Sequence, residues 1–193
     1  WGLAWCRNLE SYADYSNRIA RGRSYVRAGS VIDLSVGRGR IRALVQGSRR
    51  TPYTVTVGID LLQGKRYQDI LERCGSRIET LEALAEGDLP QEMEQLYTDQ
   101  KSGLFPSPAE IHFNCSCPDH ARMCKHVAAV LYAVGNRLDR DPLRFFELRG
   151  IDATDFIQKT VEKKLDDMLA HADAKTERTI DASQVSDLFG IVS

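Results

Sequence analysis

The sequence Cys-Ser-Cys-Pro-Asp-His-Ala-Arg-Met-Cys-Lys-His occupies residues 115 to 126 and crowds metal-binding side chains into one short segment. It holds three of the five cysteines and two of the four histidines of the 193-residue chain. A hydrophobic core needs side-chain volume spread over many elements and has no need for three neighbouring thiols, whereas a metal ion does. The segment therefore predicts a metal site.

The spacing places four ligands where a strand meets a helix. Residues 110–114 alternate in the manner of a strand, so Cys115 and Cys117, two residues apart, can direct both sulfurs to one point. Cys124 and His126 precede an apolar helical run. We expect Cys124 just outside that helix and His126 in its first turn, because two residues two apart inside a helix would diverge.

Three sulfurs and one imidazole nitrogen complete a tetrahedral zinc site and leave no position for water or substrate, so the sequence predicts one structural Zn²⁺ ion. His120 lies in the intervening loop and could replace His126 as the fourth ligand. A disulfide within the Cys-x-Cys pair would be strained. The thiols could also form a redox centre or be ordinary buried cysteines, and Cys6 and Cys74 fit the second description as small apolar residues on helices.

A Cys-x-Cys pair on a strand, followed by a Cys-x-His pair that opens a helix, resembles the SWIM-type zinc finger. That module occurs in Swi/Snf-related ATPases, Mutator-type transposases and several recombination and ubiquitin-ligase proteins. Similarity to bacterial stand-alone SWIM zinc finger proteins extends over most of the chain, through residues 22–27, 45–49, 104–108 and 124–132. The resemblance implies DNA or protein partners, no chemistry of its own, and zinc ligands at Cys115, Cys117, Cys124 and His126.

Composition is that of an ordinary soluble globular protein, with 42% hydrophobic and 27% charged residues. No apolar run approaches the ~20 residues of a membrane span, and the N-terminus shows no secretion signal, so we predict a cytoplasmic protein without a membrane partner. The chain begins with Trp1 rather than Met, and we expect that an N-terminal piece is missing.

Charge is distributed unevenly along the chain. Residues 1–52 carry ten arginines, no lysine and three acids, a net of +7, and the remainder carries sixteen basic and twenty-four acidic residues, a net of −8. This asymmetry predicts either a basic face or internal neutralisation between lobes. The candidate nucleic-acid-binding residues are Arg21, Arg23, Arg27, Arg38, Arg40, Arg42, Arg49 and Arg50.

The pattern of apolar residues predicts an α+β fold. We expect a helix over residues 1–17, a short edge strand at 25–27, and an antiparallel meander of strands at 31–36, 40–46 and 53–59. A helix over residues 67–87 is expected to cover the meander, and a shorter helix starts at Pro90. Beyond the metal segment, helices are predicted from residue 126, over 141–150 and over 153–172.

The predicted architecture is thus a small antiparallel meander covered by helices, plus a zinc-stabilised strand-helix unit with C-terminal helices. We divide the chain into an N-terminal basic lobe at 1–100, a SWIM zinc finger at 101–138 and a C-terminal helical region at 139–193.

The function predicted from the sequence is a zinc-stabilised, nucleic-acid-associated binding module. Its partners would be DNA, RNA or a Swi/Snf-type helicase-like ATPase, and the alternative is a protein-protein adaptor without direct nucleic-acid binding. We expect neither an enzyme nor a small-molecule substrate. The cysteine-histidine cluster is used by the metal, and the sequence shows no phosphate-binding glycine loop and no carboxylate pair.

Overall fold

The computed structural model of the chain describes residues 1–11, 16–74, 99, 102–119 and 121–170. Three of its four strands follow one another and its last three helices do the same, as is typical of an α+β fold. In order they are α1 (Gly2–Glu10), α2 (Ser16–Arg27), β1 (Val31–Gly37), β2 (Arg40–Val45), β3 (Tyr53–Ile59), α3 (Gly64–Cys74), the short 3₁₀ helix Pro108–Glu110, β4 (Ile111–Cys115), α6 (Lys125–Leu138), α7 (Leu143–Arg149) and α8 (Ala153–Ala170).

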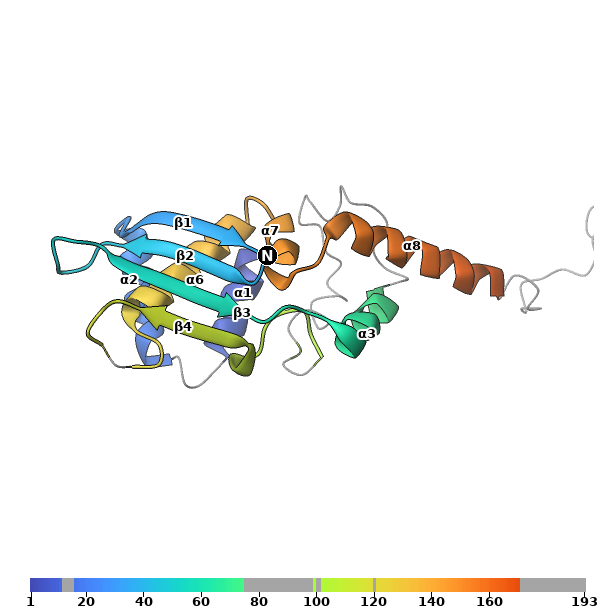
Figure 1. The fold of residues 1–193 in the computed structure, drawn as a ribbon, viewed down its shortest axis with the longest axis horizontal. Helices are drawn as coiled ribbons and strands as arrows, with labels where there is room; N and C mark the ends of the chain where they lie inside the picture. Colours follow the sequence, from blue (N-terminus) through green and yellow to red (C-terminus); the bar gives the residue numbers. More distant parts are fainter. Residues whose placement is uncertain (12–15, 75–98, 100–101, 120, 171–193) are drawn as a thin grey trace, which may run out of the picture.

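The four strands form one antiparallel sheet in the order β1-β2-β3-β4 (Figure 1). The first three are the predicted meander. The fourth, β4, comes from the predicted metal segment and pairs with β3 from Ile59↔Ile111 to Val55↔Cys115. The α+β prediction is therefore confirmed, and the metal segment shares a sheet with the meander. The predicted division of the chain at residues 100 and 138 stays a prediction.

One face of the sheet is buried and the other is open. On β2, Ile41, Ala43 and Val45 are buried while the residues between them are exposed, and β3 buries Tyr53, Val55, Val57 and Ile59. Arg40 and Arg42 accordingly lie together on the open face, as strand alternation predicts.

Helix α6 covers the buried face and contacts all four strands, and α1 and α2 pack against α6 (Figure 1). Glycine permits this close approach. A Cβ built on Gly22 of α2 would lie 2.6 Å from the Cβ of Ala128, and one on Gly135 of α6 would lie 2.9 Å from Cys6 Sγ. The helical layer is therefore held at a separation that larger side chains would not allow.

Two predictions about the N-terminal half are wrong. The edge strand predicted at 25–27 is replaced by the end of α2, because Gly22 is a packing residue within a helix rather than a helix breaker. The helix predicted over 1–17 ends at Glu10. Tertiary packing against α6 outweighs the weak local preference of this arginine-rich segment.

The predicted covering helix also differs from the structure. The structure describes α3 as far as Cys74, and this part packs against α8, while α6 covers the sheet. The rest of the helix predicted over 67–87, and the one predicted from Pro90, lie outside the described residues. The helices predicted over 141–150 and 153–172 correspond to α7 and α8.

Aromatic side chains join the two ends of the domain. Trp5 is fully buried and packs edge-on to Phe105 and Phe145, at centroid distances of 6.0 and 6.3 Å. Trp1 lies 5.4 Å from Phe145, so α1 is anchored on α7 as well as on α6. Among the helices of the described ranges, none has the length and apolar character that crossing a bilayer would require.

A buried ion pair fixes the segment that leads into β4. Arg149 is fully buried and donates to Glu110 Oε1 at 2.8 Å and to the Asp60 carbonyl at 2.7 Å. Arg66 donates to the other Glu110 oxygen at 2.8 Å. Burial acts to raise the pKa of Glu110, but Arg66, the Ser107 N–H and Arg149 outweigh it and lower that pKa to about 2.

We predict that Glu110→Gln destabilises the protein, because it leaves the Arg149 guanidinium buried without its counterion. Loss of one partner of a buried pair costs about 3–5 kcal/mol. Urea unfolding followed by circular dichroism measures the change. Arg144→Gln is the control, since Arg144 makes exposed pairs with Asp141 and Glu147, and pairs of that kind contribute about 1 kcal/mol or less.

The same carboxyl predicts a pH dependence. Its pKa is lower in the folded than in the unfolded chain, so its stabilisation is complete above pH 4.5 and is lost as the pH falls towards about 2. The Glu110→Gln variant should lack this component of acid destabilisation. Equal acid sensitivity in parent and variant would contradict the assignment.

Candidate metal centre

The four predicted ligands come from the end of β4 and the start of α6. Cys115 is the last residue of β4, and Cys117 follows two residues later. Cys124 is the N-cap of α6 with extended backbone angles, and His126 lies in the first turn of that helix. The predicted junction between a strand and a helix is therefore present.

The ligand atoms of these four residues lie within 4.8 Å of one another. His126 Nδ1 is 3.9 Å from Cys115 Sγ and 3.8 Å from Cys124 Sγ. A tetrahedral ion with bonds of about 2.3 Å to sulfur and about 2.0–2.1 Å to nitrogen sets that separation near 3.6 Å. The cluster of three sulfurs and one imidazole thus fits a single structural zinc ion, with all four positions taken by the protein.

Burial and the N-terminus of α6 act on the pKa of the Cys124 thiol in opposite directions. The Val127 N–H points at Cys124 Sγ from 3.5 Å, which is the usual bond of an N-cap side chain. Burial raises the pKa of both the Cys115 and the Cys124 thiols, whereas this N–H acts to lower the pKa of Cys124. Because the metal-free thiols hold their protons, zinc binding must release protons and must strengthen as pH rises.

Two tyrosines and a glycine orient the imidazole. The ring of His126 lies 4.4 Å from the ring of Tyr53 and 5.4 Å from that of Tyr25. Its Nε2 atom is buried and has no hydrogen-bond partner among the described residues. A Cβ on Gly47 would lie 2.4 Å from Tyr53 Cε2 and 3.0 Å from His126 Nε2. The ring therefore fits only where residue 47 has no side chain, which leaves Nδ1 facing the sulfurs.

Sequence reasoning did not assign Tyr25, Tyr53 or Gly47 to the metal centre. Tyr53 reads as an ordinary strand residue and Gly47 as a turn residue, and only the fold brings them to His126. The one signal in the sequence was Gly47 itself. The structure shows that its backbone angles do not require a glycine.

The other cysteine and histidine whose side chains the structure describes are Cys6 and His112, and both lie outside the cluster. His112 is on the open face of the sheet, and its Nε2 is 2.9 Å from Asp60 Oδ1. Cys6 is in α1, where burial raises the pKa of its thiol to about 11. His120, the alternative ligand, and the side chain of Cys74 lie outside what the structure describes.

The structure divides the eight predicted nucleic-acid-binding arginines into two groups. One group follows β2 and its flanking turns, and we name it the arginine stripe: Arg38, Arg40, Arg42, Arg49 and Arg50. Arg38 donates to the Gly150 carbonyl at 3.0 Å, and Arg49 lies over the Tyr53 ring at 5.6 Å. Arg40, Arg42 and Arg50 are exposed and make no ion pair with any described residue.

The second group, Arg21, Arg23 and Arg27, lies on α2, which α6 separates from the sheet. Arg23 pairs with Glu10 and donates to the Tyr132 hydroxyl at 3.1 Å. The predicted set is therefore not one continuous surface, because α2 is a helix and not the start of the meander.

Comparison with known proteins agrees with the geometry. Residues 114–135 match the family described as the SWIM zinc finger, a span that contains all four ligands and most of α6. The chain therefore carries a SWIM zinc finger and is a zinc-binding module. No solved structure matches the chain.

The chain is also similar to an uncharacterized protein of Mycobacterium tuberculosis. The two are 35% identical over 158 residues, which covers 81% of this chain and 57% of that protein. The chain thus spans little more than half the length of this curated relative. The similarity therefore extends well beyond residues 114–135.

We predict that Cys117→Ala abolishes stoichiometric zinc binding, because three remaining ligands leave the tetrahedral site incomplete. Structural zinc contributes about 10–16 kcal/mol of apparent binding free energy in small fingers, so its loss should also lower the melting temperature. Zinc content by elemental analysis and thermal circular dichroism measure both effects. Cys6→Ala, which removes a thiol outside the cluster, should keep its zinc; one equivalent of zinc in Cys117→Ala would refute the ligand set.

We predict that Gly47→Ala weakens zinc binding without touching a ligand. The new methyl group would collide with the Tyr53 ring and displace the His126 ring behind it. Changes to groups that orient a ligand typically cost about 10- to 100-fold in metal affinity. Competition with a chromophoric chelator measures the affinity. Gly37→Ala is the matched control, because a Cβ there meets only a Glu147 oxygen at 3.8 Å and should leave the affinity unchanged.

Proposed function

We propose that this chain is a nucleic-acid-associated module that contacts phosphate groups through the open face of its sheet. The observation that carries the proposal is the arginine stripe, in which Arg40 and Arg42 project from the uncovered face of β2. Arg38 precedes them, and Arg49 and Arg50 follow the strand. Guanidinium groups without carboxylate partners are suited to bind phosphate oxygens.

The neighbours of Arg42 on the open face suit the same ligand. The register places Ser35, Arg42, Thr56 and Asn114 side by side across the four strands. Three strand spacings make this row about 14 Å wide. Hydroxyl and amide side chains contact phosphate and sugar oxygens alongside arginine, so the row offers uncharged hydrogen-bonding groups on both sides of the cation.

Acidic residues do not cancel the charge of this face. Asp33 and Asp60 lie at its margins, and Asp60 is engaged by His112. Both are exposed, and neither is paired with Arg40 or Arg42 in the described part of the chain. We assign the zinc ion a structural role in this function, since it holds β4, which carries Asn114, at the edge of the same face.

A protein adaptor that works without direct nucleic-acid contact is the second candidate. It is supported by apolar residues that stand exposed on α8 and form one helical stripe: Val161, Leu165, Met168 and Leu169. Exposed apolar patches of this kind mark interaction sites. We propose a Swi/Snf-type helicase-like ATPase as the partner of such an adaptor, because SWIM modules occur in Swi/Snf-related ATPases.

We predict that changing both Arg40 and Arg42 to Glu weakens binding of DNA and RNA oligonucleotides and leaves the fold and the zinc content intact. Log affinity falls with log salt, and each lost phosphate contact makes this slope shallower by about 0.9 on duplex DNA and about 0.7 on single strands. The slope of the double variant should therefore be shallower than that of the parent by about 1.4–1.8. Fluorescence anisotropy at several salt concentrations measures it.

The matched control changes Arg21 and Arg27 to Glu, which alters the net charge equally on the far side of α6. This control should bind as the parent does. Equal weakening in both double variants would mean that net charge and not the open face governs binding. If the parent binds neither single-stranded nor double-stranded oligonucleotides at low salt, the nucleic-acid proposal fails and the adaptor stands.

A further inference from the structure

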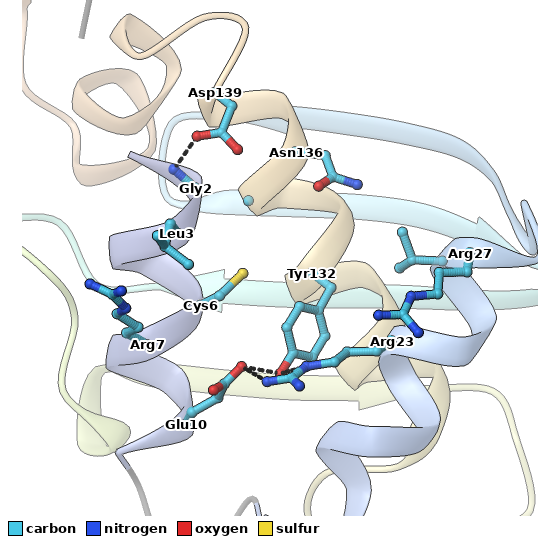
Figure 2. A pocket seen from close by; sticks show the side chains of 12 residues that line it. Gly2, Leu3, Cys6, Arg7, Glu10, Arg23, Arg27, Tyr132, Asn136 and Asp139 are labelled. Atoms are coloured by element: carbon cyan, nitrogen blue, oxygen red, sulfur yellow. Dashed lines mark hydrogen bonds and ion pairs between the residues drawn. The ribbon is translucent and has the colours of Figure 1, made fainter. Parts of the chain in front are cut away.

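Helices α1 and α2 lie side by side on α6, and a groove of about 510 Å³ runs between them (Figure 2). Its floor is α6, with Gly135 and the Tyr132 ring. Leu3 and Cys6 line it from α1, and Val26 lines it from α2. These residues give the groove a mainly apolar lining on the side of the molecule opposite the open face of the sheet.

The groove exists because each helix packs closely on α6. Glycines bring both helices onto α6, Gly22 in α2 against Ala128 and Gly135 in α6 beneath Cys6. At one end the gap is bridged by the ion pair of Arg23 with Glu10, and Tyr132 donates to the same carboxylate at 2.6 Å (Figure 2). The bridge fixes the spacing of the two walls.

The walls of the groove are long enough for a short helical segment. At 1.5 Å per residue, the wall from Gly2 to Glu10 on α1 extends for about 14 Å, and the wall from Arg23 to Arg27 on α2 extends for about 8 Å. Leu3 is an apolar side chain that is 61% exposed at the edge of the groove. A helix laid between α1 and α2 would cover it, in the way that helix-in-groove complexes bury their apolar faces.

The charges around the groove select the partner. Both acids on its rim are engaged within the molecule: Glu10 by Arg23 and Tyr132, and Asp139 by the Gly2 N–H at 2.7 Å. Arg27 reaches over the groove from α2, is exposed, and makes no ion pair with the described residues (Figure 2). The rim therefore presents an uncompensated cation beside an apolar floor.

We propose that this groove binds one amphipathic helix of a partner protein, with its apolar stripe against Leu3, Cys6 and Val26 and an acidic residue facing Arg27. The inference is independent of nucleic-acid binding, because α6 lies between the groove and the sheet. The module would then hold a protein on its helical side and leave the open face of the sheet free.

A phage-displayed library of helical peptides of about 15 residues, long enough to span α2, tests this on the full zinc-loaded chain. Selection on the parent with counter-selection on Leu3→Asp should enrich peptides that have an apolar stripe flanked by Glu or Asp. Synthetic copies of the enriched peptides should bind the parent and lose about tenfold in affinity on Arg27→Glu, because the reversed charge faces the acidic residue of the peptide.

Arg21→Glu is the matched control, because it makes the same charge change on an exposed residue of the same helix that does not line the groove. It should leave peptide affinity within about twofold of the parent. The zinc content and circular dichroism of each variant verify that it is folded. The proposal is overturned if no peptide survives counter-selection, if the survivors carry basic flanks, or if they bind Arg27→Glu as tightly as the parent.

Discussion

The joint between β4 and α6 is the constraint on which the rest of the structure depends. Cys115 ends the strand and Cys124 begins the helix, so one ion bound by both fixes the end of the sheet relative to the start of the helix. Helix α6 then contacts every strand on one side and carries α1 and α2 on the other. A change in the direction of α6 would therefore displace the sheet on one side and helices α1 and α2 on the other.

Zinc does not act alone in placing this joint. The opposite end of β4 is preceded by Glu110, whose carboxylate is held between Arg66 and the buried Arg149. The strand is thus fixed at one end by a metal cluster and at the other by a buried ion pair. Breaking such a pair costs several kcal/mol, which is a large share of the stability of a domain of this size.

Parts of this architecture could be predicted from the sequence because the signals are local. The Cys-x-Cys and Cys-x-His pairs fix the metal type, and the alternation of Arg40, Ile41, Arg42 and Ala43 fixes which side of β2 is buried. The nature of α2 could not be predicted in this way, since Gly22 has the same local signature whether it breaks a helix or packs one against Ala128. The position of Tyr53 against His126 and the Glu110–Arg149 pair depend on long-range contacts that no spacing encodes.

The sheet also has a consequence for the behaviour of the protein when zinc is scarce. Strand β4 is an outer strand, and outer strands that come loose can recruit the strands of other molecules. Without the ion, the polypeptide following β4 is no longer tied to the start of α6, so β4 can peel away and expose the buried edge of β3. Metal supply would then govern the solubility of the protein and its resistance to proteolysis.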